Sequence, residues 1–124
     1  MLEMRPVYTS YEREEYTKPF GITPEDDKTV ICARYPDKFV GIAYVSFDGT
    51  EGIVHLLSLI DGYDDETDIF LLGKAMLNFL DLHGVKNVTY PYVTDVPLAK
   101  RLGFRENENG TYTLCLEGYF TGHH

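Results

Sequence analysis

Five carboxylates crowd the segment Asp61–Asp68, which reads DGYDDETD and precedes the most regular apolar pattern in the chain. Carboxylates in such a position can cap a helix, hold a cation such as Ca²⁺, or repel an anion. The spacing matches no EF-hand loop, which leaves a calcium site as the weaker alternative. We therefore expect Glu66, Thr67 and Asp68 to act as helix caps.

Three other residues of reactive type lie in apolar, strand-like segments. His55 is in register with Ile53 and Leu57, which is more typical of a core histidine with a satisfied ring than of a catalyst. Cys32 and Cys115 belong to no CxxC or CxxH spacing. They are predicted to be buried free thiols, and no metal centre is expected.

The charge of the chain limits its partners. Acidic residues outnumber basic residues by 20 to 11 among 124 residues, and no dense run of Lys and Arg appears in the sequence. This balance excludes nucleic acid and an anionic membrane surface as expected partners. No apolar segment is long enough to span a bilayer, and the N-terminus lacks the apolar region of a signal peptide. We expect a cytoplasmic protein.

Length and globular composition predict one domain over residues 1–124, with a short N-terminal arm (1–27), a core (28–120) and a tail (121–124). In the arm, Thr9 to Glu12 form a capping box for a short helix that should end near Lys18, before Pro19. In the tail, His123 and His124 are either native or the remnant of a purification tag.

Apolar periodicity divides the core into a strand meander followed by helices and further strands. The predicted strands are Lys28–Tyr35, Phe39–Phe47, Glu51–Ile60, Val85–Val93 and Thr111–Phe120, and the predicted helices run from Asp68 to His83 and from Val96 to Leu102. We expect an α/β (α+β) fold with a mostly antiparallel twisted sheet, a long central helix and a short C-terminal helix.

This order of elements resembles the GNAT family of acyl-CoA N-acyltransferases over about residues 28–120. The phrases that carry the resemblance are Leu57-Ser58-Leu59-Ile60 followed by Tyr63, Gly73-Lys74-Ala75-Met76-Leu77, Leu82-His83-Gly84-Val85-Lys86-Asn87-Val88, and Leu102-Gly103-Phe104-Arg105. The resemblance implies a GNAT-like mixed sheet. It also implies an N-acetyltransferase that transfers an acyl group from acyl-CoA to an unidentified small amine or protein amine.

The resemblance further implies where acetyl-CoA would bind. In the family, the third strand of the meander diverges from the strand after the main helix and opens a cleft for the pantetheine arm. The positions implied to bind the cofactor are Leu57, Ser58 and Leu59 along the arm, and Leu71, Leu72, Gly73 and Lys74 at the start of the helix, where backbone N–H groups hold pyrophosphate.

The sequence departs from the family pattern at three places. In the phosphate motif Gln/Arg-x-x-Gly-x-Gly/Ala, Asp68 stands at the Arg position and Leu71 at the middle Gly. Ala99 stands where many members carry a Tyr that protonates the departing thiolate. The arm is also too short for the strand and paired helices that commonly shape the acceptor pocket.

These departures keep a second hypothesis open, a catalytically inactive GNAT-fold binding or regulatory module that does not use CoA. A third hypothesis is an acidic protein that occupies a basic site on a partner. The catalytic residues stay unassigned, because Glu51, His55, Tyr90 and Tyr92 have groups suited to deprotonating an amine but form no motif. The aromatic content of 14% permits a homodimer.

Overall fold

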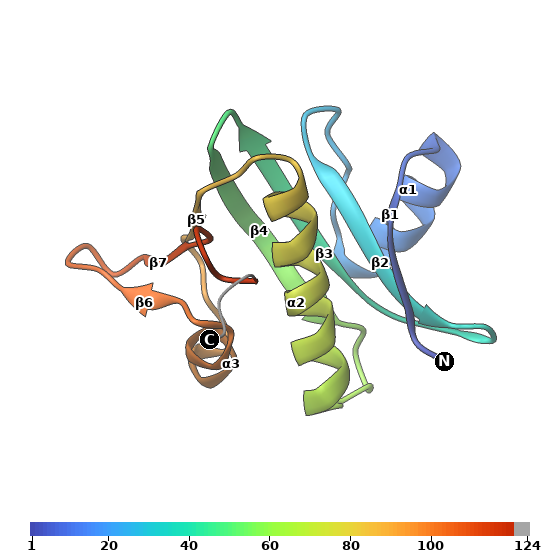
Figure 1. Ribbon diagram of the computed structural model, residues 1–124. Coiled ribbons are helices and arrows are strands. Elements are labelled where there is room, and N and C mark those ends of the chain that lie inside the picture. Colours follow the sequence, from blue (N-terminus) through green and yellow to red (C-terminus); the bar gives the residue numbers. More distant parts are fainter. Residues whose placement is uncertain (121–124) are drawn as a thin grey trace.

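A twisted seven-stranded sheet organises the computed structural model, which describes residues 1–120 (Figure 1). The strands are β1 (Glu3–Val7), β2 (Thr29–Tyr35), β3 (Lys38–Asp48), β4 (Glu51–Leu59), β5 (Asn87–Tyr90), β6 (Arg105–Glu106) and β7 (Tyr112–Cys115). Their order in the sheet is β1-β2-β3-β4-β5-β7-β6, and only the β4–β5 pair is parallel. The predicted fold class is confirmed.

The helices pack on opposite faces of the sheet and create two cores. α2 (Glu66–Leu82) and α3 (Val96–Leu102) cover one face, where Leu72, Met76 and Leu102 are fully buried. On the other face α1 (Ser10–Thr17) and the short 3-10 helix η1 (Lys18–Phe20) close a smaller core that contains Tyr16. Within residues 1–120 no helix has the length and apolar character needed to cross a membrane.

The N-terminal arm contains a strand in addition to α1 and η1, so the expectation that the arm is too short to hold a strand was wrong. β1 pairs with β2 in antiparallel register, from Glu3 opposite Arg34 to Val7 opposite Val30. Its sequence EMRPV is short and polar and includes Pro6, which has no backbone N–H to donate. Such a segment can form a strand only at a sheet edge, and β1 is an outer strand.

The ends of the helices follow their capping residues. The hydroxyl of Thr9 accepts a hydrogen bond from the Glu12 N–H at 3.2 Å and starts α1, as predicted. The central helix begins at Glu66, two residues before the predicted start, because the N-cap is Asp65, whose carboxylate accepts from the Asp68 N–H at 2.9 Å. The prediction that Glu66, Thr67 and Asp68 are the caps was therefore wrong, because these three residues form the first turn of the helix and Asp65 is the cap.

A β-bulge at His55 changes which face of β4 each side chain occupies. Tyr44 pairs with Leu56 and Val45 pairs with Val54, so His55 is an extra residue in β4. The His55 ring lies beside Tyr44 on the α1 side, whereas Leu57 joins the core under α2. The predicted register of His55 with Leu57 was wrong, because the bulge shifts the side-chain alternation by one residue.

The C-terminal strands are shorter than the apolar pattern indicated. The predicted strands Val85–Val93 and Thr111–Phe120 correspond to β5 and β7, which have four residues each, and β6 was not predicted. Cys32 is buried, as expected, but Cys115 at the end of β7 is exposed. The predicted burial of Cys115 was therefore wrong.

Gly41 of β3 allows β4 to approach closely where β4 ends. A Cβ at this position would lie 2.6 Å from the Ser58 carbonyl oxygen and 3.0 Å from the Leu59 Cα. We expect Gly41→Ala to lower the free energy of unfolding by about 1–3 kcal/mol, because backbone atoms must move to admit the methyl group. Urea denaturation measures this change. The exposed substitution Asp48→Ala on the same strand serves as control and should change it by less than about 0.5 kcal/mol, and equal effects would contradict the close approach.

Candidate functional site

The two halves of the sheet separate between β4 and β5. The parallel pairing covers only three residue pairs, from Glu51 opposite Asn87 to Ile53 opposite Thr89. Beyond Ile53, β4 continues to Leu59 without a strand partner on that side. β5 instead pairs with β7 along its whole length. The sheet therefore opens into a cleft along the second half of β4.

The backbone of β4 presents free hydrogen-bonding groups to this cleft. The N–H of Ile60 donates to the Val40 carbonyl at 2.9 Å, which fixes the phase of the antiparallel ladder with β3. Because paired and unpaired residues alternate in such a ladder, the N–H and C=O groups of Leu57 and Leu59 point away from β3. The Ser58 hydroxyl already donates to the Leu59 carbonyl at 3.0 Å.

A pocket of about 230 Å³ lies at this edge. Its lining residues are Leu57, Ser58 and Leu59 of β4, Tyr63 and Asp64 of the following loop, Ile69 of α2, and Thr94, Asp95 and Leu98 at the start of α3. The structure thus brings Leu57, Ser58 and Leu59 together, but their assignment to a cofactor stays a prediction. The contribution of the α3 start was not foreseen, although Asp95 was recognisable as a helix cap and accepts from the Leu98 N–H at 3.0 Å.

The other implied cofactor residues lie inside α2, away from the free end of the helix. Leu71 is five residues beyond the helix start at Glu66, so its N–H and those of Leu72 and Gly73 lie within the helical hydrogen-bond ladder. Leu72 is fully buried, and Gly73 permits contact with α3, since a Cβ there would lie 2.6 Å from a Leu102 methyl group. Their assignment also stays a prediction, and the backbone offers it no free donor.

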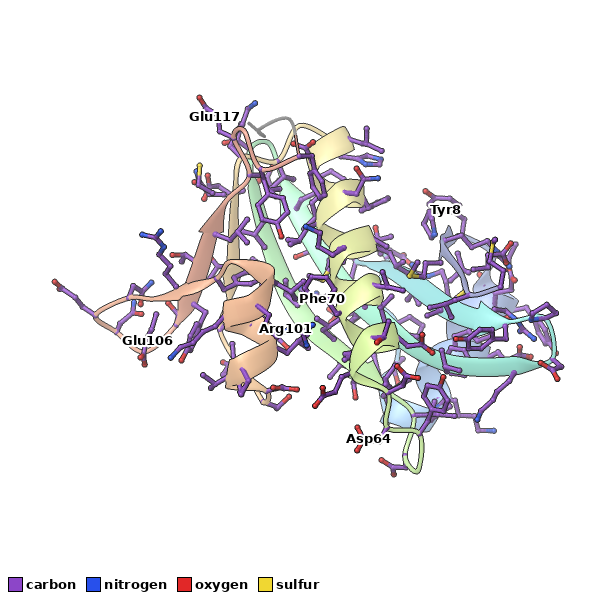
Figure 2. All side chains as sticks on the ribbon, turned by 60° about the horizontal axis from the view of Figure 1, so that its bottom comes forward. Tyr8, Asp64, Phe70, Arg101, Glu106 and Glu117 are labelled. Atoms are coloured by element: carbon purple, nitrogen blue, oxygen red, sulfur yellow. The ribbon has the colours of Figure 1, made fainter. Side chains whose placement is uncertain are left out.

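The free N–H groups at the start of α2 lie among carboxylates. Of the first helical residues, Glu66 and Thr67 have N–H groups without an intrahelical acceptor, while the Asp68 N–H is capped by Asp65. Asp64 and Asp65 precede them directly, and Asp64, which lies near the start of α2 in Figure 2, lines the pocket. Negative charge already occupies the end of the helix where the macrodipole would favour an anion.

Asp68 is a structural anchor of this region. Its side chain is buried and accepts hydrogen bonds from the hydroxyls of Tyr35, at 2.9 Å, and Tyr63. These bonds stabilise the neutral phenols and raise the pKa of both tyrosines above the ordinary value of 10. The Lys38 ammonium lies over the Tyr63 ring, 4.3 Å from its centroid. Asp68 therefore joins the first turn of α2 to β2 and to the loop after β4.

None of the four candidates for proton transfer lines the pocket. Glu51 is exposed and accepts from the Asn87 amide at 3.0 Å, and the His55 Nε2 lies 2.7 Å from the Ser46 hydroxyl on the α1 side of the sheet. Burial lowers the pKa of His55. Tyr90 is in the core, where burial raises its pKa to about 12, and Tyr92 is exposed.

The residue at the position where the resembling family has its general acid, Ala99, also has no proton to donate. Ala99 has no exposed surface and packs in the core beneath α3. Of the residues that line the pocket, Ser58, Thr94 and Tyr63 carry hydroxyl groups, and the one phenol, that of Tyr63, is held by Asp68.

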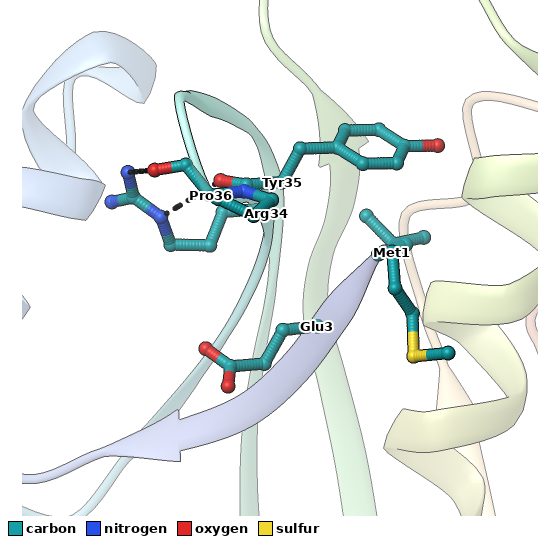
Figure 3. Close-up of a pocket in the computed structure, with 6 residues that line it drawn as sticks. Met1, Glu3, Arg34, Tyr35 and Pro36 are labelled. Atoms are coloured by element: carbon teal, nitrogen blue, oxygen red, sulfur yellow. Dashed lines mark hydrogen bonds between the residues drawn. The ribbon is translucent and has the colours of Figure 1, made fainter.

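A larger hollow of about 470 Å³ lies beside the start of β1 and has no comparable chemistry (Figure 3). It is lined by Met1, Leu2, Glu3, Arg34, Tyr35 and Pro36. The Arg34 guanidinium, its strongest donor, is already bonded to the Tyr16 hydroxyl and to the carbonyls of Tyr35 and Pro36. The cleft at β4 is therefore the better candidate site.

Known structures place this arrangement in the GNAT fold. The ribosomal-protein-S18-alanine N-acetyltransferase from Escherichia coli superposes with a TM-score of 0.72 at 14% identity, over 93% of this chain and 94% of that chain. A GNAT family N-acetyltransferase (YhbS) from Escherichia coli in complex with CoA gives 0.72 at 15% identity, over 98% and 85%. A GNAT family acetyltransferase from Elizabethkingia anophelis with acetyl-CoA bound gives 0.68 at 11% identity, over 93% and 98%.

Comparison of the amino-acid sequence alone does not detect this similarity. It matches no protein-family model and no curated protein. At identities of 11–15% the likeness shows the fold, which confirms the GNAT-like architecture implied by the resemblance.

The anchor at Asp68 gives a testable stability effect. We expect Asp68→Asn to lower the free energy of unfolding by about 1–2 kcal/mol, because the amide loses the charge that strengthens both tyrosine hydrogen bonds. Asp64→Asn removes the same charge from an exposed neighbour and should change it by less than about 0.5 kcal/mol. Urea denaturation compares the two variants, and equal effects would show that Asp68 is not an anchor.

Proposed function

We propose that this GNAT-fold chain is an acyl-CoA-dependent N-acetyltransferase that acts on an amine. The observation that carries the proposal is the unpaired edge of β4, where the backbone groups of Leu57 and Leu59 face a pocket between the two halves of the sheet. A ligand arm that contains amide groups can pair with such an edge as an additional strand would.

The residues of the cleft fit the neutral part of acyl-CoA. The pantetheine arm carries amides, and Leu57, Ile69 and Leu98 provide apolar walls on either side of the free strand edge. Bound acyl-CoA would supply an activated acyl group, whose carbonyl carbon would form a bond to the amine nitrogen as its bond to sulfur breaks, and the departing thiolate would take up the proton that the amine loses. The chain contributes chiefly by holding this group in place, since none of its proton-transfer candidates lines the pocket.

The start of α2 does not fit the pyrophosphate. Asp64, Asp65 and Glu66 surround the only free N–H groups of the helix, and each would repel a phosphate group. The fit of the ligand is therefore good along β4 and poor at the helix end.

A second candidate is a GNAT-fold binding module that does not use CoA. It is supported by the carboxylate that already caps α2 and by the buried Ala99 at the position of the expected acid. Both observations concern features that the resembling family commonly uses, a free helix N-terminus for pyrophosphate and a Tyr that protonates the thiolate.

Binding of acetyl-CoA separates the two candidates. We expect acetyl-CoA to raise the melting temperature of the full chain in a concentration-dependent manner, because a ligand that binds only the folded state stabilises it. S-acetylpantetheine, which lacks the nucleotide, should also raise it at higher concentration. If neither compound raises the melting temperature at millimolar concentration, the chain is not an acyltransferase of this kind.

The role of the β4 edge has its own test. Leu59→Pro removes an N–H that makes no bond to β3, whereas Leu59→Ala removes the side chain and keeps the N–H. We expect S-acetylpantetheine to bind the proline variant about fivefold more weakly than the alanine variant, which corresponds to about one hydrogen bond. Calorimetry measures both affinities after each variant has been shown to melt cooperatively, and equal affinities would exclude pairing at Leu59.

A further inference from the structure

Two positively charged side chains lie near the same aromatic ring between α2 and α3. The Lys74 ammonium lies 5.9 Å and the Arg101 guanidinium 4.7 Å from the centroid of the Phe70 ring. Because these distances add to 10.6 Å, the two charges are at most about 11 Å apart. Figure 2 shows Phe70 and Arg101 side by side in the space between the two helices.

These charges have no carboxylate partner within residues 1–120. The ion pairs found there involve only Arg5 and Lys28. Lys74 instead donates to the Tyr119 hydroxyl at 3.2 Å and lies over the rings of Tyr119 and Phe120, at 4.4 and 5.3 Å. In a chain with a formal charge of −9, two neighbouring cations held by aromatic rings form a local site for an anion.

The position of these cations relative to the cleft is fixed by the packing of the helices. Gly73 brings α2 into contact with Leu102 of α3, and the Tyr119 hydroxyl donates to the Leu102 carbonyl, which holds the end of α3. Phe70 directly follows Ile69, and Arg101 lies about one turn after Leu98, and both Ile69 and Leu98 line the pocket. The ring that both cations contact is therefore adjacent to residues of the cleft, and Lys74 lies about two helical turns beyond the acidic start of α2 at Glu66.

We propose that Lys74 and Arg101 bind the phosphate groups of the nucleotide end of the thioester ligand, in place of the α2 N-terminus. Guanidinium forms paired hydrogen bonds to phosphate, ammonium adds a point charge, and the exposed aromatic ring of Phe120 offers a surface for the base. The proposal rests on the proposed function, because it concerns the anionic half of the same ligand. It explains how a chain with carboxylates at the helix end can hold that half.

The two halves of the ligand allow separate tests. Adenosine 3′,5′-bisphosphate has the phosphates and the base without the arm, and S-acetylpantetheine has the arm without the phosphates. We expect Lys74→Gln and Arg101→Gln each to weaken bisphosphate binding at least tenfold and to leave S-acetylpantetheine binding within twofold of wild type, by calorimetry on the full chain. Lys86→Gln removes the same charge from an exposed lysine at the start of β5 and should change neither affinity.

Each result decides between the proposals. Failure of the bisphosphate to bind at millimolar concentration, equal binding by wild type and both variants, or equal binding of inorganic pyrophosphate in its place would overturn the nucleotide site. Failure of S-acetylpantetheine alone would overturn the function proposed for the β4 cleft. Arg101 is exposed and makes no hydrogen bond that maintains the fold, so Arg101→Gln remains informative if Lys74→Gln loses stability through Tyr119.

Discussion

The position of α2 across the sheet depends on the buried carboxylate of Asp68. This group lies in the first turn of the helix and bonds to Tyr35 of β2 and to Tyr63 of the preceding loop. It thereby holds the first turn of α2 against the sheet, while Asp65, which caps the Asp68 N–H, sets where the helix starts. The cleft depends on the same anchor, because Tyr63, which bonds to Asp68, lines the cleft together with β4 and with Ile69 of α2.

The sequence predicted the helices and strands that have a clear local pattern of apolar and capping residues. The meander, the central helix and the short C-terminal helix all follow apolar periodicity and capping residues, and they were found in order. β1 was missed because its polar sequence forms a strand only beside β2, a partner distant in sequence. The bulge at His55 was missed for a related reason, since it depends on how β3 and β4 register with each other.

The candidate site was predictable where it follows the strand and not where it follows the helix. Leu57, Ser58 and Leu59 were implied by one phrase and lie together at the pocket. The helix start was predicted two residues late, because the apolar periodicity begins only at Ile69, whereas the structure starts the helix at Glu66, after its cap Asp65. The meeting of Lys74 and Arg101 depends on the packing of two helices, and no pattern in the sequence indicates it.

The short ladder between β4 and β5 has a consequence for motion. Only three residue pairs join β4 to β5, and the other connections between the two halves of the sheet include hydrogen bonds from Lys86 and Asn87 to Thr50 and the contact of α2 with α3. Regions joined by few backbone hydrogen bonds can open as separate cooperative units below the global unfolding free energy. Amide protons of β5 and β7 should then exchange with solvent sooner than those of β2 and β3. A molecule that contacts both sides of the cleft would slow this exchange, because it would have to be released before the two halves could separate.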